Sequence, residues 1–141
     1  MKSKIFLFAT VALLFSLRMA MAQEKLGKVD FQVSCSPAAQ AQFNRAVAML
    51  HSFWFPQAPK AFAAVLEVDP DCAMAHWGIA ISQRANPLVG PPDTGALKRG
   101  LASVEKAKAI GAKTQRERDY IAAIELFYKD SDKLDYRTRV L

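Results

Sequence analysis

The chain of 141 residues lacks the short motifs that mark common enzyme classes. It has no glycine-rich phosphate loop, no Gly-x-Ser-x-Gly nucleophile turn and no His-Glu-x-x-His zinc helix. His51 and Ser52 are adjacent, but they could not act as base and nucleophile without a third group to position them. No segment alternates apolar and polar residues with the period of a strand. The sequence therefore predicts an all-α protein that is not an enzyme and has no catalytic residues.

Long apolar runs are scarce, and the one that is present lies at the start of the chain. Residues 5–17 carry no charge, Lys2 and Lys4 flank them, and Ala20-Met21-Ala22 supplies a small-x-small cleavage site. These features predict a signal peptide at residues 1–22 and a mature chain that begins at Gln23. The run of 13 residues is too short for a membrane span, which needs about 20. We expect a periplasmic or secreted protein without a stable membrane span.

A strong excess of one charge is also absent from the mature chain. The full chain has a net charge of +6, but signal cleavage removes Lys2, Lys4 and Arg18, which leaves 16 basic and 13 acidic residues. Basic residues at positions 98–118 alternate with acidic ones such as Glu105. This alternation is typical of a solvated helix surface, whereas nucleic-acid binding needs a basic stripe on one face. We therefore expect no nucleic-acid partner.

Cysteine is scarce, and its two copies predict a cross-link. Cys35 and Cys72 are the only cysteines, and an isolated pair in an oxidising compartment is most often a disulfide. The bond would close a loop of 36 intervening residues. In the chain-entropy model such a bond stabilises the folded state by about 3 to 4 kcal/mol. We predict a disulfide between Cys35 and Cys72.

Soft metal ligands near Cys72 leave a second interpretation open. Cys72 and His76 are four residues apart and would share a helix face, while Met74 would lie off that face. His51 would approach His76 from a neighbouring helix. Sulfur and imidazole ligands suit copper or zinc, so a periplasmic metal-handling module is an alternative function. Because a disulfide would occupy Cys72, and a site needs three or four converging ligands, we predict no metal and no other cofactor.

Helical spacing of apolar residues and local start and stop signals predict helices at residues 37–141, after an irregular arm at residues 23–36. Ser36-Pro37 starts a helix, Asp69-Pro70 ends one, Gly111 caps one, and Thr114-x-x-Glu117 is a capping box. A loop at positions 86–94 contains three prolines. The expected helices cover about residues 37–51, 56–69, 71–84, 94–110 and 115–129, and a sixth begins near residue 133.

The order of small, aromatic and proline residues in the middle of the chain resembles the tetratricopeptide repeat, a helix pair that recurs every 34 residues. Ala46 and Ala58 stand where the two helices of a repeat cross, Phe62 is the aromatic packing residue and Pro70 ends the repeat. Ala80 follows Ala46 by 34 positions, as the repeat requires.

The later repeats depart from this pattern. The loop at positions 86–94 is long for an interhelix turn, and Gly111-Ala112 stands in place of the closing proline. The segments His51-Ser-Phe-Trp54 and Cys72-Ala-Met-Ala-His-Trp-Gly78 look like those of exported bacterial tetratricopeptide proteins. The resemblance implies a right-handed solenoid of antiparallel helix pairs at residues 37–141, with about two and a half to three repeats. Because a polar terminal helix is missing, we expect a piece truncated at its C-terminus.

In such repeats the first helix of each pair lines a concave groove that binds a protein or peptide. The resemblance assigns this role to six residues: Phe43, Val47 and Leu50 in the first repeat, and Trp77, Ile81 and Arg84 in the second. Tryptophan and arginine are typical hot-spot residues at such interfaces. Two alternatives stay open. Later helices or the N-terminal arm fill the groove, or the chain is a structural N-terminal part of a larger protein.

Overall fold

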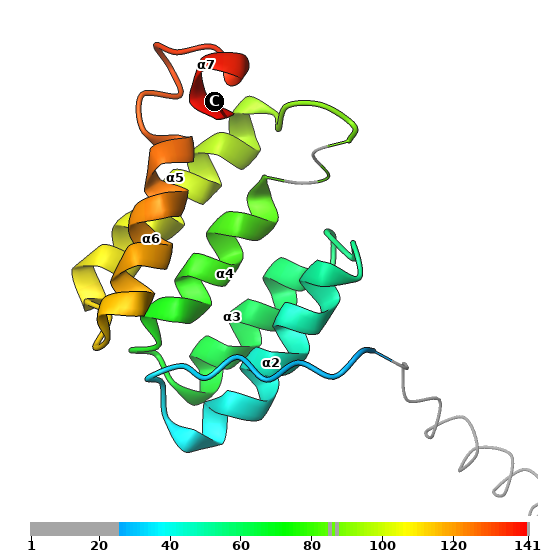
Figure 1. The fold of residues 1–141 in the computed structure, drawn as a ribbon, viewed down its shortest axis with the longest axis vertical. Helices are drawn as coiled ribbons and strands as arrows, with labels where there is room; N and C mark the ends of the chain where they lie inside the picture. The colour runs from blue at the N-terminus through cyan, green and yellow to red at the C-terminus, as the bar shows by residue number, and fades with distance from the viewer. Residues whose placement is uncertain (1–25, 85, 87, 141) are drawn as a thin grey trace, which may run out of the picture.

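The computed structural model describes residues 26–84, 86 and 88–140, and this part of the chain contains helices but no strand. The helices in chain order (Figure 1) are α2 (Pro37–His51), α3 (Ala58–Val68), α4 (Ala73–Gln83), α5 (Thr94–Ile110), α6 (Gln115–Tyr128) and α7 (Tyr136–Val140). The predicted all-α class is confirmed. The predicted signal peptide at residues 1–22 and the start of the predicted arm lie outside the described residues. Among the described helices, none combines the length and the apolar character that a membrane span requires.

Helix ends follow the sequence wherever a cap side chain or a glycine sets them. α2 begins at Pro37, as predicted. α5 is capped at its start by the Asp93 carboxylate and at its end by Gly111, which has a φ of 81°. α6 carries the predicted capping box, in which Thr114 Oγ1 accepts from the Glu117 N–H and the Glu117 carboxylate accepts from the Thr114 N–H. These ends are local, so the sequence alone predicts them.

Three helices begin later than predicted, because turns precede them. α3 begins after a turn in which Phe53 adopts a φ of 60°, so the helix does not start at the first proline of this segment. Before α4, the Cys72 N–H donates to the Asp69 carbonyl at 3.1 Å, which extends the turn past the predicted start. Before α7, the Lys133 N–H donates to the Asp130 carbonyl at 2.9 Å in the same way.

Consecutive helices pack against each other, and α4 is central because it also contacts α2 and α6. In the core, the rings of Phe43 and Phe62 lie with centroids 5.6 Å apart. Two glycines let aromatic rings touch helix backbones: Gly78 faces Phe62, and Gly100 faces the buried Tyr128. The helices are therefore held at short range by a few large side chains.

The N-terminal arm, residues 26–36, has no regular secondary structure and crosses over α2 (Figure 1). Its partly buried apolar side chains, among them Val29, Phe31 and Val33, pack against the core. The disulfide between Cys35 and Cys72 confirms the predicted bond and joins the end of the arm to the start of α4. The arm is thus part of the folded domain, attached to it at one end by a covalent bond.

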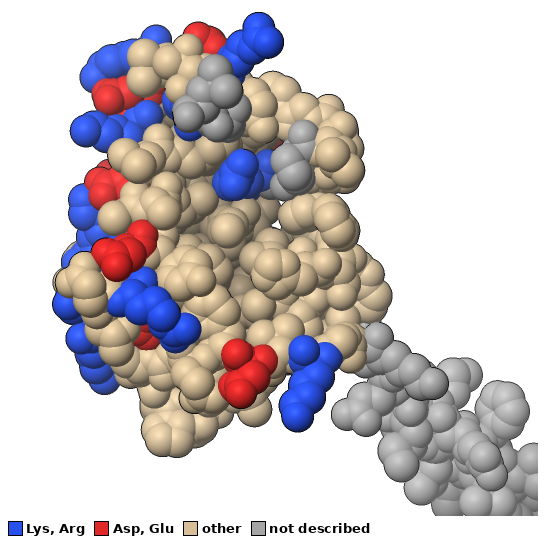
Figure 2. Space-filling model, viewed as in Figure 1, with Lys and Arg blue, Asp and Glu red and all other residues tan. Residues whose placement is uncertain are grey.

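Charged side chains are spread unevenly over the molecule. In Figure 2 they gather over α5, α6 and α7, where both signs are interspersed, and much of the remaining visible face is uncharged. Lys108 on α5 pairs with Glu125 on α6 at 2.5 Å. Interspersed charges of this kind are typical of a solvated helix surface.

Candidate functional site

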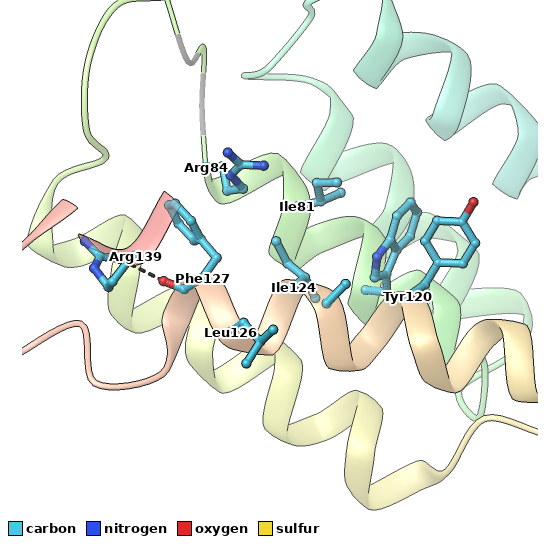
Figure 3. A pocket seen from close by; sticks show the side chains of 9 residues that line it. Ile81, Arg84, Tyr120, Ile124, Leu126, Phe127 and Arg139 are labelled. Atoms are coloured by element: carbon cyan, nitrogen blue, oxygen red, sulfur yellow. Dashed lines mark hydrogen bonds between the residues drawn. The ribbon is translucent and has the colours of Figure 1, made fainter. Parts of the chain in front are cut away.

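An open pocket lies between α4 and α6, with α7 at one end (Figure 3). Its volume is about 420 Å³. The residues that line it are Trp77, Ile81, Arg84, Tyr120, Ala123, Ile124, Leu126, Phe127 and Arg139. They lie in or directly beside three different helices, so the pocket exists only in the folded chain.

The walls of this pocket are largely aromatic and aliphatic. Trp77 is 5% exposed and meets Tyr120 edge to face, with ring centroids 5.4 Å apart. Tyr120, Ile124 and Phe127 are spaced by four and three residues, which places them on one face of α6. Leu126, also on α6, is 68% exposed at the rim. Aromatic residues are enriched among those that contribute most of the binding energy at protein interfaces.

Two arginines flank the aromatic wall. The guanidinium carbon of Arg84 lies 4.6 Å from the centroid of the Phe127 ring, and that of Arg139 lies 5.2 Å from it. Arg139 Nη1 also donates a hydrogen bond to the Phe127 carbonyl at 2.8 Å. Cation–π contacts hold a guanidinium group over a ring without neutralising its charge. Both positive charges are therefore fixed at the pocket.

The charge of this pocket is not balanced by its own walls. Among the described residues that line it, none is acidic. Arg84 Nε is buried and has no hydrogen-bond partner in the part of the chain that the structure describes. A buried donor without a partner costs about 1 to 3 kcal/mol. An anionic group in the pocket would offset the two positive charges.

The structure brings the three predicted second-repeat residues, Trp77, Ile81 and Arg84, together in this pocket. The sequence did not lead us to predict the opposite wall, which includes Tyr120 and Arg139. The helical spacing of aromatic and aliphatic residues along α6 could have indicated the part of this wall that α6 supplies. No comparable signal exists for α7, because its contact with the pocket depends on the path of the chain after α6.

The three first-repeat residues lie elsewhere. Phe43, Val47 and Leu50 are 0%, 2% and 8% exposed, so as placed they offer no open surface to a partner. The ring of Phe31 in the arm packs on Phe43, with centroids 5.7 Å apart. This contact corresponds to the alternative in which the arm fills part of the groove.

The candidate metal ligands do not gather into a site. His51 is exposed at the end of α2, whereas Met74 and His76 are buried in α4. Cys72 is bonded to Cys35. Burial, with a further effect of Lys106, lowers the pKa of His76 and so favours its neutral form. Among the described residues, no group of three or more histidine, cysteine or acidic side chains could hold a metal ion.

No family model matches the chain, and no curated protein or solved structure matches it either. The similarity to tetratricopeptide repeats is therefore carried by the residues of this chain alone.

Proposed function

We propose that this protein is an exported helical scaffold, built like a tetratricopeptide domain, that binds a peptide segment of a partner protein between α4 and α6. The observation that carries the proposal is the pair of guanidinium groups, of Arg84 and Arg139, held over the Phe127 ring in a pocket whose described lining has no acidic residue. Such a site suits a ligand that combines an anionic group with an apolar side chain. A peptide with an acidic residue or a terminal carboxylate next to a large apolar residue has both parts.

The order of helix packing supports the repeat-like arrangement. α2 contacts α4 and α4 contacts α6, while α3 and α5 are the intervening helices. Stacked helix pairs place their first helices side by side in this way, and the face formed by those helices is the one that binds peptides in such repeats. The pocket lies on the α4–α6 part of that face.

Selection of peptides from a random display library against the mature protein tests the binding proposal. Enriched peptides are expected to pair Asp, Glu or a free C-terminus with a large apolar residue. Fluorescence anisotropy then measures their affinity for variants. Arg84→Gln should weaken binding about tenfold or more, because a hydrogen bond to a charged group contributes about 1.5 to 3 kcal/mol.

Arg137→Gln is the matched control, since Arg137 is exposed on α7 and does not line the pocket. It should bind the selected peptides as the wild type does. The proposal is wrong if no peptide is enriched, or if Arg84→Gln and Arg139→Gln both bind with unchanged affinity while retaining helical circular dichroism.

Export is a separate part of the proposal. It is supported by the apolar N-terminal run and by the disulfide between Cys35 and Cys72. Intact mass spectrometry of the protein recovered from outside the cytoplasm should give a chain that begins at Gln23. A chain that retains residues 1–22 would contradict it.

A further inference from the structure

The arm lies across the helices in an extended conformation with two distinct faces. From residue 28 to residue 33 exposed and partly buried side chains alternate, with Val29, Phe31 and Val33 on the inner face. Alternation of this kind is the geometry of an extended chain bound on one side. Within the described residues the arm has no strand partner, because the structure there contains no strand.

Side chains of α2 bind the backbone of the arm. Asn44 Oδ1 accepts from the Phe31 N–H at 3.2 Å. Gln40 Oε1 accepts from the Val33 N–H at 3.1 Å, and Gln40 Nε2 donates to the Phe31 carbonyl at 2.8 Å. The two amide side chains therefore replace the ladder that a neighbouring strand would supply. Contacts to backbone groups do not depend on which side chains the bound segment carries.

The N-terminal end of α6 binds the next part of the arm. The Glu117 carboxylate accepts from the Ser34 N–H at 2.6 Å and from the Ser34 hydroxyl at 2.5 Å. Arg116 donates to the Gln32 carbonyl. Ser34 and Glu117 are 83 positions apart in the sequence, and Gln32 and Arg116 are 84 apart. The arm therefore links α2 to α6.

One aromatic side chain anchors the arm to three helices. The Phe31 ring lies 5.7 Å from Phe43 of α2, 5.8 Å from Trp77 of α4 and 5.3 Å from Tyr120 of α6, measured between centroids. The guanidinium carbon of Arg116 lies 5.0 Å from its centroid. A large aromatic residue in a pocket of aromatic rings is the usual anchor of a bound peptide.

From this geometry we propose that the surface beneath the arm, here called the arm seat, is a second peptide-binding site occupied by the chain's own arm as an internal ligand. Its side chains are those that contact residues 31–34 of the arm, among them Gln40, Phe43, Asn44, Trp77, Arg116, Glu117 and Tyr120. The external ligand that fits is an extended segment with an aromatic residue followed three positions later by serine, as Phe31 and Ser34 are placed. The arm's own contacts carry this inference, so it does not depend on the ligand proposed for the open pocket.

The disulfide explains why the arm is the default occupant. The Cys35–Cys72 bond attaches the arm directly beside its seat. A short tether of this kind gives a segment an effective concentration on the order of millimolar. An external segment therefore competes only when the arm's own anchor is weakened or when the external segment binds much more tightly.

Binding of a labelled synthetic peptide to the full mature chain tests the proposal. The probe is fluorescein-labelled Leu-Gly-Lys-Val-Asp-Phe-Gln-Val-Ser, the sequence of residues 26–34. Phe31→Ala in the protein removes the internal anchor and should bind the probe about tenfold more tightly than the wild type, because loss of an aromatic anchor typically costs more than 1 kcal/mol. The same probe with Ala in place of Phe should not bind.

Gln32→Ala is the matched control, because the side chain of Gln32 is exposed and bonds only to Asp30 within the arm. It should behave as the wild type. Arg84→Gln should leave probe binding by the Phe31→Ala protein unchanged, which separates this inference from the open pocket. A folded Phe31→Ala protein that does not bind the probe overturns the proposal.

Hydrogen exchange on the wild-type protein keeps the proposal testable if Phe31→Ala does not fold. The amide hydrogens of Phe31, Val33 and Ser34 should exchange by local opening, well before those of α4. Arm amides that exchange only with global unfolding would mean that the arm is an inseparable part of the core, and would overturn the proposal.

Discussion

At the scale of single residues, the Tyr128 ring on α6 packs directly against Gly100 on α5. A Cβ atom on Gly100 would lie 2.1 Å from Cζ of Tyr128. Tyr128 is fully buried, and its hydroxyl donates to the Ala80 carbonyl at 2.6 Å. Burial raises the pKa of Tyr128 despite the opposing effect of Arg84 and Arg139, so the hydroxyl remains a donor. The ring is thus held at its hydroxyl end, and it can move away from Gly100 only by straining this hydrogen bond.

We predict that Gly100→Ala destabilises the protein by about 1 to 3 kcal/mol, the usual cost of overpacking a core. The added methyl group displaces the Tyr128 ring and strains its hydrogen bond to Ala80. The free energy of unfolding from urea titration, followed by circular dichroism, measures this loss.

Gly95→Ala, on the same helix, is the comparison that isolates the packing effect. Its added Cβ would meet only the ends of two exposed side chains, Asp93 at 3.0 Å and Arg99 at 3.1 Å. Alanine is also more favourable than glycine in a helix by about 1 kcal/mol. The free energy of unfolding of this variant should therefore stay within about 1 kcal/mol of the wild-type value. A Gly100→Ala protein as stable as Gly95→Ala would show that the ring is free to shift.

At the scale of the elements, Glu117 links the start of α6 to the arm. Burial alone would raise the pKa of Glu117, but hydrogen bonds from Ser34 and Thr114 outweigh it and lower the pKa below the ordinary value. A carboxylate with a lowered pKa stabilises the fold while it is ionised. This stabilisation is fully present above the ordinary glutamate pKa of 4.5 and is lost as the pH falls through the lower folded value.

We therefore predict that the wild type loses stability below about pH 4.5 and that Glu117→Gln does not show this loss. At neutral pH Glu117→Gln should be less stable by about 1 to 3 kcal/mol, because buried hydrogen-bonding groups lose a charged partner. Urea titrations at several pH values measure both effects. His76 also lowers the stability as the pH falls below its ordinary pKa of 6.5, because its pKa is lowered in the folded state. This loss is common to the wild type and Glu117→Gln.

Asp119→Asn is the control, since Asp119 is exposed on α6 and, among the described residues, its side chain accepts a hydrogen bond from the nearby Gln115 alone. It should keep the acid-induced loss of stability. Parallel pH profiles for the wild type and Glu117→Gln would instead mean that another carboxylate causes the loss.

Helix termini show how far the sequence determines these elements. The caps at Thr114 and Gly111 could be predicted because each one involves residues at most a few positions apart. The start of α3 could not, because the backbone of Phe53 turns into the left-handed region, which proline positions do not reveal. The second bond of Glu117, to Ser34, is tertiary, and no spacing in the sequence predicts it.

At the scale of the whole molecule, the face formed by α2, α4 and α6 is divided between the arm and the open pocket. Trp77 and Tyr120 contact Phe31 of the arm, and both also line the pocket. The resemblance to repeats predicted a face made of first helices but could not say how much of it is covered. Coverage depends on where the arm folds back, and that is set by contacts with α6 that lie far away in the sequence.

The disulfide is the covalent element that fixes this arrangement, and its removal tests its weight in the whole fold. The bond closes a loop of 36 intervening residues that contains α2 and α3. We predict that full reduction lowers the free energy of unfolding by about 3 to 4 kcal/mol, because the unfolded chain regains loop entropy. Urea titrations with and without dithiothreitol measure the change, and a gain of two hydrogens in the intact mass confirms reduction. A variant with both Cys35→Ala and Cys72→Ala should have the same free energy of unfolding as the reduced wild type, and dithiothreitol should not change it. Equal urea midpoints for the oxidised and reduced wild type would contradict the prediction, because they would mean that the bond gives no net stabilisation by restricting the unfolded chain.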